Sequence, residues 1–196
     1  SEKGKLEMLQ ARTGNRTGAA AVKIACDMVK EKLIDEKTAL LRIPAGDLRQ
    51  MMLPSFDPDA KKKAEVLTVG LNASPGAAVG KLAFTAEEAV DRAHEGEKVL
   101  LIRKETSPED IDGMHSAEGI LTSTGGRTSH AAVVAVGWGK CCVAGAGEIQ
   151  IDEKKRQSKI GNKTYTHKDT LSIDGSTGEV MAGEVPTVDP KLGGDF

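Results

Sequence analysis

Aromatic residues are scarce in this 196-residue sequence: phenylalanine, tyrosine and tryptophan together make up 3% of it. Hydrophobic residues account for 39%, so a core must be built mainly from valine, isoleucine, leucine and alanine. No apolar run reaches the roughly 20 residues that a membrane-spanning helix needs. We therefore expect a globular fold with small core side chains and no membrane contact.

Cysteine and net charge are low as well. Three cysteines, of which Cys141 and Cys142 are adjacent, make neither a disulfide framework nor the two spaced pairs of a zinc site. Adjacent residues of a strand point to opposite faces, so one of this pair should lie in the core and the other toward a helix or loop. A formal net charge of −2 argues against a general nucleic-acid-binding protein. No signal-peptide pattern follows Ser1, and we expect a reducing, cytoplasmic setting.

The most informative stretch is a glycine-rich loop that runs into a small apolar segment. It reads Gly125-Gly126-Arg127-Thr128-Ser129-His130, followed by six apolar residues and Gly137. Threonine and serine are good N-cap residues, so the loop is predicted to open a short buried helix that Gly137 ends. His130 would lie in the first turn, where N–H groups and the helix dipole favour an anion. With a reference pKa of about 6.5, an imidazole there can act as a nucleophile and hold a phosphoryl group.

A structural role for His130 is the competing interpretation, because a lone histidine beside an apolar run is more often a packed residue at a helix start. The other histidines, His94, His115 and His167, have polar neighbours without metal-ligand spacing, so we predict that they lie on the surface and that the chain holds no metal site of its own.

The order of predicted elements places this loop at the edge of a sheet. Helices are predicted over residues 17–33, 35–41, 45–52 and 85–95 and from Ser107, with a solvated lysine run at 61–63. Strands are predicted over 66–70, at the end of 71–84, and over 98–103, 119–123 and 140–145. A hairpin over 158–165, with 170–175 and 178–181, is predicted to complete a second β layer. A strand that leads through glycines to a helix puts the loop where open α/β sheets bind ligands.

Residues 105–111, 120–122 and 125–142 resemble the phosphohistidine domain of the pyruvate phosphate dikinases. Phosphoenolpyruvate synthase and enzyme I of the sugar phosphotransferase system are more distant relatives. The similarity extends from about residue 4 to residue 196. It implies an α/β fold, a swivelling β/β/α phosphohistidine domain after a short helical linker. It also implies that His130 accepts the phosphoryl group and that Gly125, Gly126, Arg127, Thr128 and Ser129 form the phosphate-binding loop.

The resemblance also divides the chain. Residues 1–16 match the end of an ATP-grasp nucleotide-binding domain, in which Gln10 and Arg12 correspond to positions that face the nucleotide and its magnesium. Residues 17–59 correspond to the helical linker or hinge, 60–186 to the swivelling domain, and 187–196 to the start of a linker to a barrel that binds phosphoenolpyruvate or pyruvate. We expect that both ends are cuts from a longer protein.

By the same resemblance the whole enzyme is a phosphotransferase that interconverts ATP, phosphate and pyruvate with AMP, pyrophosphate and phosphoenolpyruvate. Its partners would be its own ATP-grasp and barrel domains, which bind Mg²⁺, and the full-length protein would be a homo-oligomer. It would be cytoplasmic or reside in an organelle such as a plastid or glycosome. In some relatives the residue that matches Thr128 is phosphorylated by a regulatory kinase. The alternatives are a carrier domain of a phosphoenolpyruvate synthase or enzyme I, and a non-catalytic module of the same fold.

Two residues depart from the dikinase pattern. Arg127 stands where dikinases usually have methionine, and Val136 stands where most relatives carry arginine. The added cation at Arg127 could hold a phosphate, or it could lower the pKa of His130.

Overall fold

In the computed structural model, residues 18–189 are described, and they fall into two compact units that divide after Met51. The first unit has three helices: α1 Gly18–Lys30, α2 Glu36–Arg42 and α3 Ala45–Met51. Its small core contains Ala21, Val22, Ala25 and Ala39. These helices confirm the predicted ones, and Asp35 caps α2 by accepting from the Thr38 N–H at 2.8 Å.

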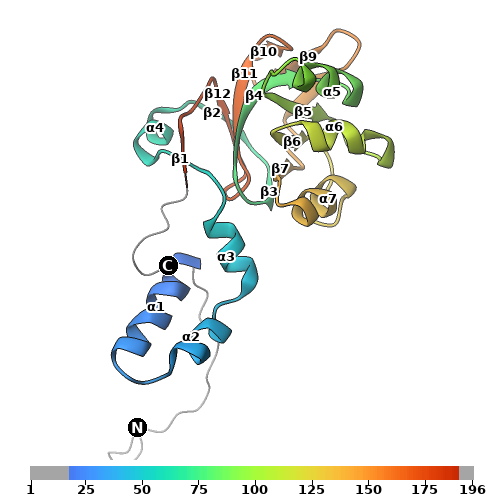
Figure 1. The fold of residues 1–196 in the computed structure, drawn as a ribbon. Helices are drawn as coiled ribbons and strands as arrows, with labels where there is room; N and C mark the ends of the chain where they lie inside the picture. The colour runs from blue at the N-terminus through green and yellow to red at the C-terminus, as the bar shows by residue number, and fades with distance from the viewer. Residues whose placement is uncertain (1–17, 190–196) are drawn as a thin grey trace, which may run out of the picture. The chain divides into compact units, whose positions relative to one another are not determined.

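The second unit, residues 52–189, is built on a mixed sheet (Figure 1). The described strands run in the order β2-β12-β11-β4-β5-β6-β7-β3. The middle strands β4 to β7 are parallel, as expected for strands joined by helical crossovers, and the outer ones pair antiparallel. Their bounds are β2 Val66–Val69, β3 Leu71–Ser74, β4 Ala77–Ala83, β5 Val99–Arg103, β6 Gly119–Thr122, β7 Cys141–Ala144, β11 Thr170–Asp174 and β12 Glu179–Ala182.

Both faces of this sheet are buried, and side chains alternate between two hydrophobic clusters. On β5, Leu100 and Ile102 join one cluster, and Val99 and Leu101 join the other. The first cluster extends to a three-stranded antiparallel sheet of β8 Ile149–Asp152, β9 Gln157–Ile160 and β10 Lys163–Thr166. The second cluster extends to helices. The unit is therefore a β/β/α arrangement, as the sequence predicts.

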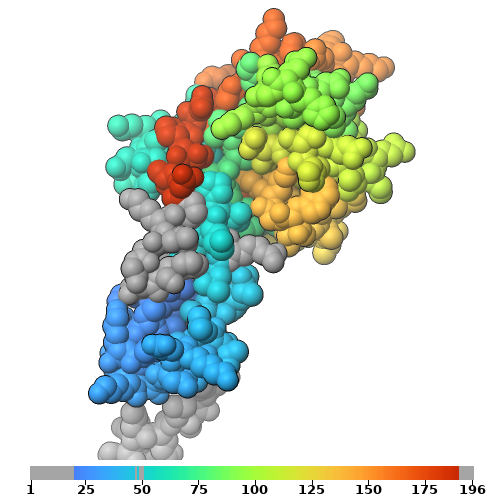
Figure 2. All heavy atoms as spheres, viewed as in Figure 1, coloured from blue at the N-terminus to red at the C-terminus, as the bar shows by residue number. Residues whose placement is uncertain are grey.

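The helical layer consists of α5 Ala86–His94, the 3₁₀ turn η1 Pro108–Asp110, α6 Ile111–Ser116 and α7 His130–Trp138. Ala89, Met114, Ala131 and Ala135 supply its buried contacts with the sheet. In Figures 1 and 2, α6 (yellow-green) lies between α5 (green) and α7 (orange). The helix that begins with His130 therefore forms one end of this layer.

Several predictions about the outer strands were wrong. The strands at 170–175 and 178–181 were assigned to the second β layer, but β11 and β12 belong to the main sheet. The second layer instead includes β8, which was not predicted. The sequence predicts a turn where β3 pairs with β7 at the sheet edge. A short run with exposed side chains gives little hydrophobic signal, and long-range pairing decides its structure.

The predicted solvated face at residues 61–63 is also wrong at one position. These residues end α4 Pro58–Lys63, and the Lys61 ammonium contacts Glu179 and lies 2.6 Å from Asp174. Hydrogen bonds from Lys61 lower the pKa of Glu179. The ion pairs fasten α4 to the turn between β11 and β12.

The segments at the two chain ends of the second unit pair with each other as a two-stranded sheet. β1 Ser55–Phe56 pairs antiparallel with β13 Thr187–Val188. The structure thus groups residues 52–59 and 187–189 with the compact unit, although the resemblance assigns them to linkers. The functional division at residues 59 and 186 stays a prediction.

The adjacent cysteines lie on opposite faces of β7, as predicted. Cys141 belongs to the cluster beneath the three-stranded sheet, and Cys142 belongs to the cluster beneath the helices. Both thiols are buried, and desolvation raises the pKa of Cys142 to about 12. We infer that both are packing residues.

Candidate functional site

The His130 loop follows the carboxyl end of β6, next to the loop that follows β5. The ladder between these strands continues past their ends: Ser123 N–H donates to the Arg103 carbonyl at 3.2 Å, and Thr124 N–H donates to the Lys104 carbonyl at 2.9 Å. Because both strands are parallel, their following loops meet at one edge. This edge is where ligands bind in open α/β sheets.

Helix α7 starts as predicted and ends later. Ser129 is its N-cap and accepts from the Ala132 N–H at 3.4 Å, which makes His130 the first helical residue. The N–H groups of His130 and Ala131 lack an acceptor within the helix by the geometry of any helix start. The prediction that Gly137 ends the helix was wrong. Gly139, with φ 67°, ends it, and the Lys140 N–H donates to the Ala135 carbonyl at 2.9 Å in a Schellman motif.

The helix is less buried than predicted. One side packs on the sheet through Ala131, Ala132 and Ala135, whereas Val133 and Val136 are 59% and 52% exposed. Trp138 is also partly exposed, and its ring meets the His115 ring edge-on with centroids 5.4 Å apart. The residue that departs from the dikinase pattern at position 136 therefore faces solvent.

Two glycines shape the loop. Gly125 has φ +96°, and a Cβ there would lie 2.8 Å from Cβ of Ser129. Gly145, with φ +62°, follows β7, and its Cβ would lie 2.6 Å from the Gly125 carbonyl oxygen. Side chains at either position would push the loop off the end of the sheet. A Cβ at Gly126 would meet no other atom within 4 Å.

The ring of His130 is held by a residue to which the sequence analysis gave no role. Thr106 Oγ1 lies 3.0 Å from His130 Nδ1, and Thr106 is only 8% exposed. Thr106 precedes the Ser107–Asp110 capping box of η1, in which the Ser107 N–H donates to Asp110 Oδ2 at 2.9 Å. Among residues 18–189, nothing is hydrogen-bonded to Nε2 of His130. When Nδ1 donates to Thr106, the lone pair lies on Nε2, which is the nitrogen available for bond formation.

The remaining predicted loop residues precede the helix along the chain. Arg127 and Thr128 are exposed, and Arg127 Nη2 donates to Asn72 Oδ1 on β3 at 2.8 Å. Gln10 and Arg12, which the resemblance assigned to a nucleotide site, lie outside the described residues. The roles of all these residues in binding stay predictions.

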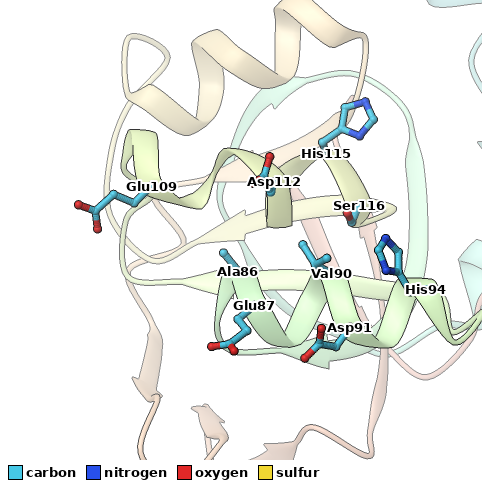
Figure 3. Close-up of a pocket in the computed structure, with 9 residues that line it drawn as sticks. All are labelled: Ala86, Glu87, Val90, Asp91, His94, Glu109, Asp112, His115 and Ser116. Atoms are coloured by element: carbon cyan, nitrogen blue, oxygen red, sulfur yellow. The ribbon is translucent and has the colours of Figure 1, made fainter.

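A second feature of the helical layer is an acidic groove of about 490 Å³ between α5 and α6 (Figure 3). Glu87 and Asp91 line it from α5, and Glu109 and Asp112 line it from η1 and α6. His94 and His115 are exposed, as predicted, whereas His167 is half-buried. Within the described part of the chain, no group of three or more acidic, histidine or cysteine side chains is arranged to hold a metal.

None of the described helices has the length and apolar character that crossing a membrane requires.

Comparison with known proteins identifies the part of the chain that carries His130. Residues 95–178 match the family model described as PEP-utilising enzyme, mobile domain. The matched residues include β5, β6, the glycine loop and α7, together with Thr106 and His130.

Curated relatives extend this likeness over the whole chain. Pyruvate, phosphate dikinases of Clostridium symbiosum and Rhizobium meliloti (strain 1021) are 52% and 51% identical over 195 residues. Pyruvate, phosphate dikinase 2 of Zea mays is 50% identical over the same length. Each alignment covers 100% of this chain and 22% of the relative, so the chain spans about a fifth of the proteins it matches. The likeness favours the dikinase line over the phosphoenolpyruvate synthase and enzyme I alternatives.

Proposed function

We propose that His130 is the phosphoryl-carrying residue of a pyruvate phosphate dikinase and that it is phosphorylated on Nε2. The supporting observation is the contact between Nδ1 and the buried Thr106 hydroxyl, at the start of a helix. A histidine with only a packing role would not need one ring nitrogen held and the other left open.

In this mechanism Thr106 keeps the proton on Nδ1, and the Nε2 lone pair attacks phosphorus. The new N–P bond forms as the P–O bond to the leaving group breaks, and the leaving oxygen takes the electron pair. The charge on the phosphoryl oxygens is met by the N–H groups of His130 and Ala131, by the hydroxyl of Thr128 and by the Arg127 guanidinium. The covalent intermediate splits one difficult transfer into two easier ones.

The complete reaction needs sites that we place on other domains of a longer protein. We propose that His130 takes a pyrophosphoryl group from ATP and loses its outer phosphate to inorganic phosphate. It then delivers the remaining phosphoryl group to pyruvate. The histidine must travel between the two sites, and the helices within residues 17–59 would provide the hinge. Mg²⁺ would be bound by the ATP-grasp and barrel domains. Taken alone, this chain should carry a phosphoryl group without turning over.

We also propose, from the resemblance to the dikinases, several properties of a full-length protein. It would be a homo-oligomer in the cytoplasm or an organelle; the names of some relatives, such as one from Mesembryanthemum crystallinum, describe them as chloroplastic. Thr128 is exposed and precedes the N-cap, so a regulatory kinase could reach its hydroxyl. A phosphate on Thr128 would crowd the anion site.

The test supplies this chain with ³²P-labelled phosphoenolpyruvate and the pyruvate-site domain of a dikinase relative. We expect acid-labile, base-stable label on His130 and none on a His130→Asn variant. If the folded wild-type chain stays unlabelled while the relative's own mobile domain is labelled, the carrier proposal is wrong for this chain. A His130→Asn variant that only lost stability would support the structural role instead.

A further inference from the structure

We propose that Asn72 is a positioning residue that holds Arg127 at the His130 loop while leaving its charge uncompensated, so that Arg127 can bind the phosphoryl group. This inference rests on the proposed function of His130. Asn72 lies on the edge strand β3, outside the matched mobile domain, and 55 residues separate it from Arg127.

The amide of Asn72 is fixed at both ends. Its Oδ1 accepts from Arg127 Nη2 at 2.8 Å, and its Nδ2 donates to the Ser176 carbonyl at 3.2 Å. The Ser176 bond keeps the oxygen turned toward Arg127, because a flipped amide would set its NH₂ group against the Arg127 N–H donor and its oxygen against the Ser176 carbonyl oxygen. On the backbone, Asn72 pairs with Val143 of β7, which anchors it to the main sheet.

The turn that presents the Ser176 carbonyl is itself well held. Asp174 Oδ1 accepts from the N–H groups of Ser176 and Thr177 at 2.8 and 3.2 Å, and Asp174 is buried against Lys61. The Gly178 N–H donates to the Asp174 carbonyl at 2.7 Å. The contact that orients Asn72 is therefore part of a hydrogen-bonded turn and not of a loose loop.

The choice of a neutral partner matters for Arg127. Across residues 18–189, the Arg127 side chain bonds to Asn72 and has no carboxylate partner. By contrast, Arg92 pairs with Glu88 and Glu97, and Arg156 also pairs with Glu88. An amide accepts one hydrogen bond without neutralising the cation. Four of the five guanidinium N–H donors stay available for phosphate oxygens.

Because Asn72 and Arg127 are both exposed, the effects should be modest and sensitive to salt. The orientation of Arg127 should change the rate by a few-fold, and the loss of its charge should change it more. These two effects can be separated by two substitutions at the same position. Asn72→Ala removes the hydrogen bond to Arg127 and leaves the Arg127 charge uncompensated. Asn72→Asp instead neutralises the Arg127 charge by forming an ion pair with it.

The experiment uses the 196-residue chain and phosphoramidate, an anionic chemical donor that needs no partner domain. The P–N bond of the donor breaks, ammonia leaves with the electron pair, and the N–P bond to Nε2 forms. Peptide mass spectrometry gives the phosphorylation rate of His130 relative to the exposed His94 in the same sample. We expect Asn72→Ala to lower this rate ratio about threefold. The ratio should still fall as salt is added, as it does in the wild type. Asn72→Asp should lower it about tenfold and flatten the salt dependence.

Two controls make the outcome specific. Asn162→Asp places the same charge in the exposed hairpin turn between β9 and β10 and should leave both the rate and the salt dependence unchanged. In an Arg127→Met background, Asn72→Ala should have no further effect. An equal loss in both backgrounds, or an unchanged rate in Asn72→Asp, would overturn the inference. If wild-type His130 reacts no faster than His94, the proposed function fails first and this inference falls with it.

Discussion

Replacing Thr106 by valine would remove the one hydrogen bond that the described structure gives to the His130 ring. Valine has nearly the same shape as threonine, and position 106 is buried, so packing should be kept. Without the hydroxyl, the ring can place its proton on Nε2 as well as on Nδ1, and the Nε2-protonated tautomer has no lone pair at the attacking nitrogen. We therefore expect a slower reaction in a folded protein.

The size of the effect follows from the single bond that is lost. A hydrogen bond contributes a net ~0.5–1.5 kcal/mol, so about 1 kcal/mol of preference for the productive tautomer should disappear. That corresponds to an approximately fivefold fall in the phosphorylation rate. Thr106→Ser, which keeps a hydroxyl, should recover most of the rate.

The assay is again the phosphorylation of His130 relative to His94, combined with ¹⁵N NMR of the imidazole nitrogens to report the tautomer. Thr68→Val is a matched control, because Thr68 is also buried and bonds to Glu148 at 3.0 Å, away from the His130 ring. It should leave the rate and tautomer of His130 unchanged. Equal rates in Thr106→Val and the wild type, with an unshifted tautomer, would show that the Thr106 contact has no part in phosphorylation.

Two predictions concern stability. Gly125→Ala should cost about 1–3 kcal/mol by forcing a side chain into a left-handed conformation, whereas Gly126→Ala should be nearly neutral; thermal melts that do not separate the two would contradict the loop geometry. Lys61→Met should cost about 1–3 kcal/mol, and its exposed neighbour Lys62→Met much less, as measured by urea unfolding. Since the pKa of Glu179 is lowered in the folded state, its contribution is present above its ordinary value of 4.5 and is lost as the pH falls through the lowered one. The cost of Lys61→Met should therefore shrink in acid, and a cost that stays constant down to pH 3 would argue against the ion pair.

The sequence predicted the elements that carry strong local signals. The apolar runs of β5 and β6, the helix predicted over residues 85–95 and the serine before His130 all form the predicted structures. These signals are periodicity and capping, which depend on neighbours a few residues away. For the same reason the position of His130 at a helix start could be predicted.

Contacts between distant residues could not be predicted in this way. Thr106 and His130 are 24 residues apart, and Asn72 and Arg127 are 55 apart, so each pair depends on strand order. The end of α7 shows a subtler limit. Gly137 and Gly139 both suit a helix end, and the hydrogen bonds after the helix select the second.

The pairing of β1 with β13 has a consequence for how the second unit can move. Ser55 lies opposite Val188, so the chain segments that lead into and out of this unit are neighbours. A body fastened at two distant points resists rotation, because turning it stretches one attachment against the other. A body attached at two adjacent points can rotate about them as about a single hinge. Under the proposed carrier function, a unit held in this way would carry His130 through an arc while both attachments keep their length.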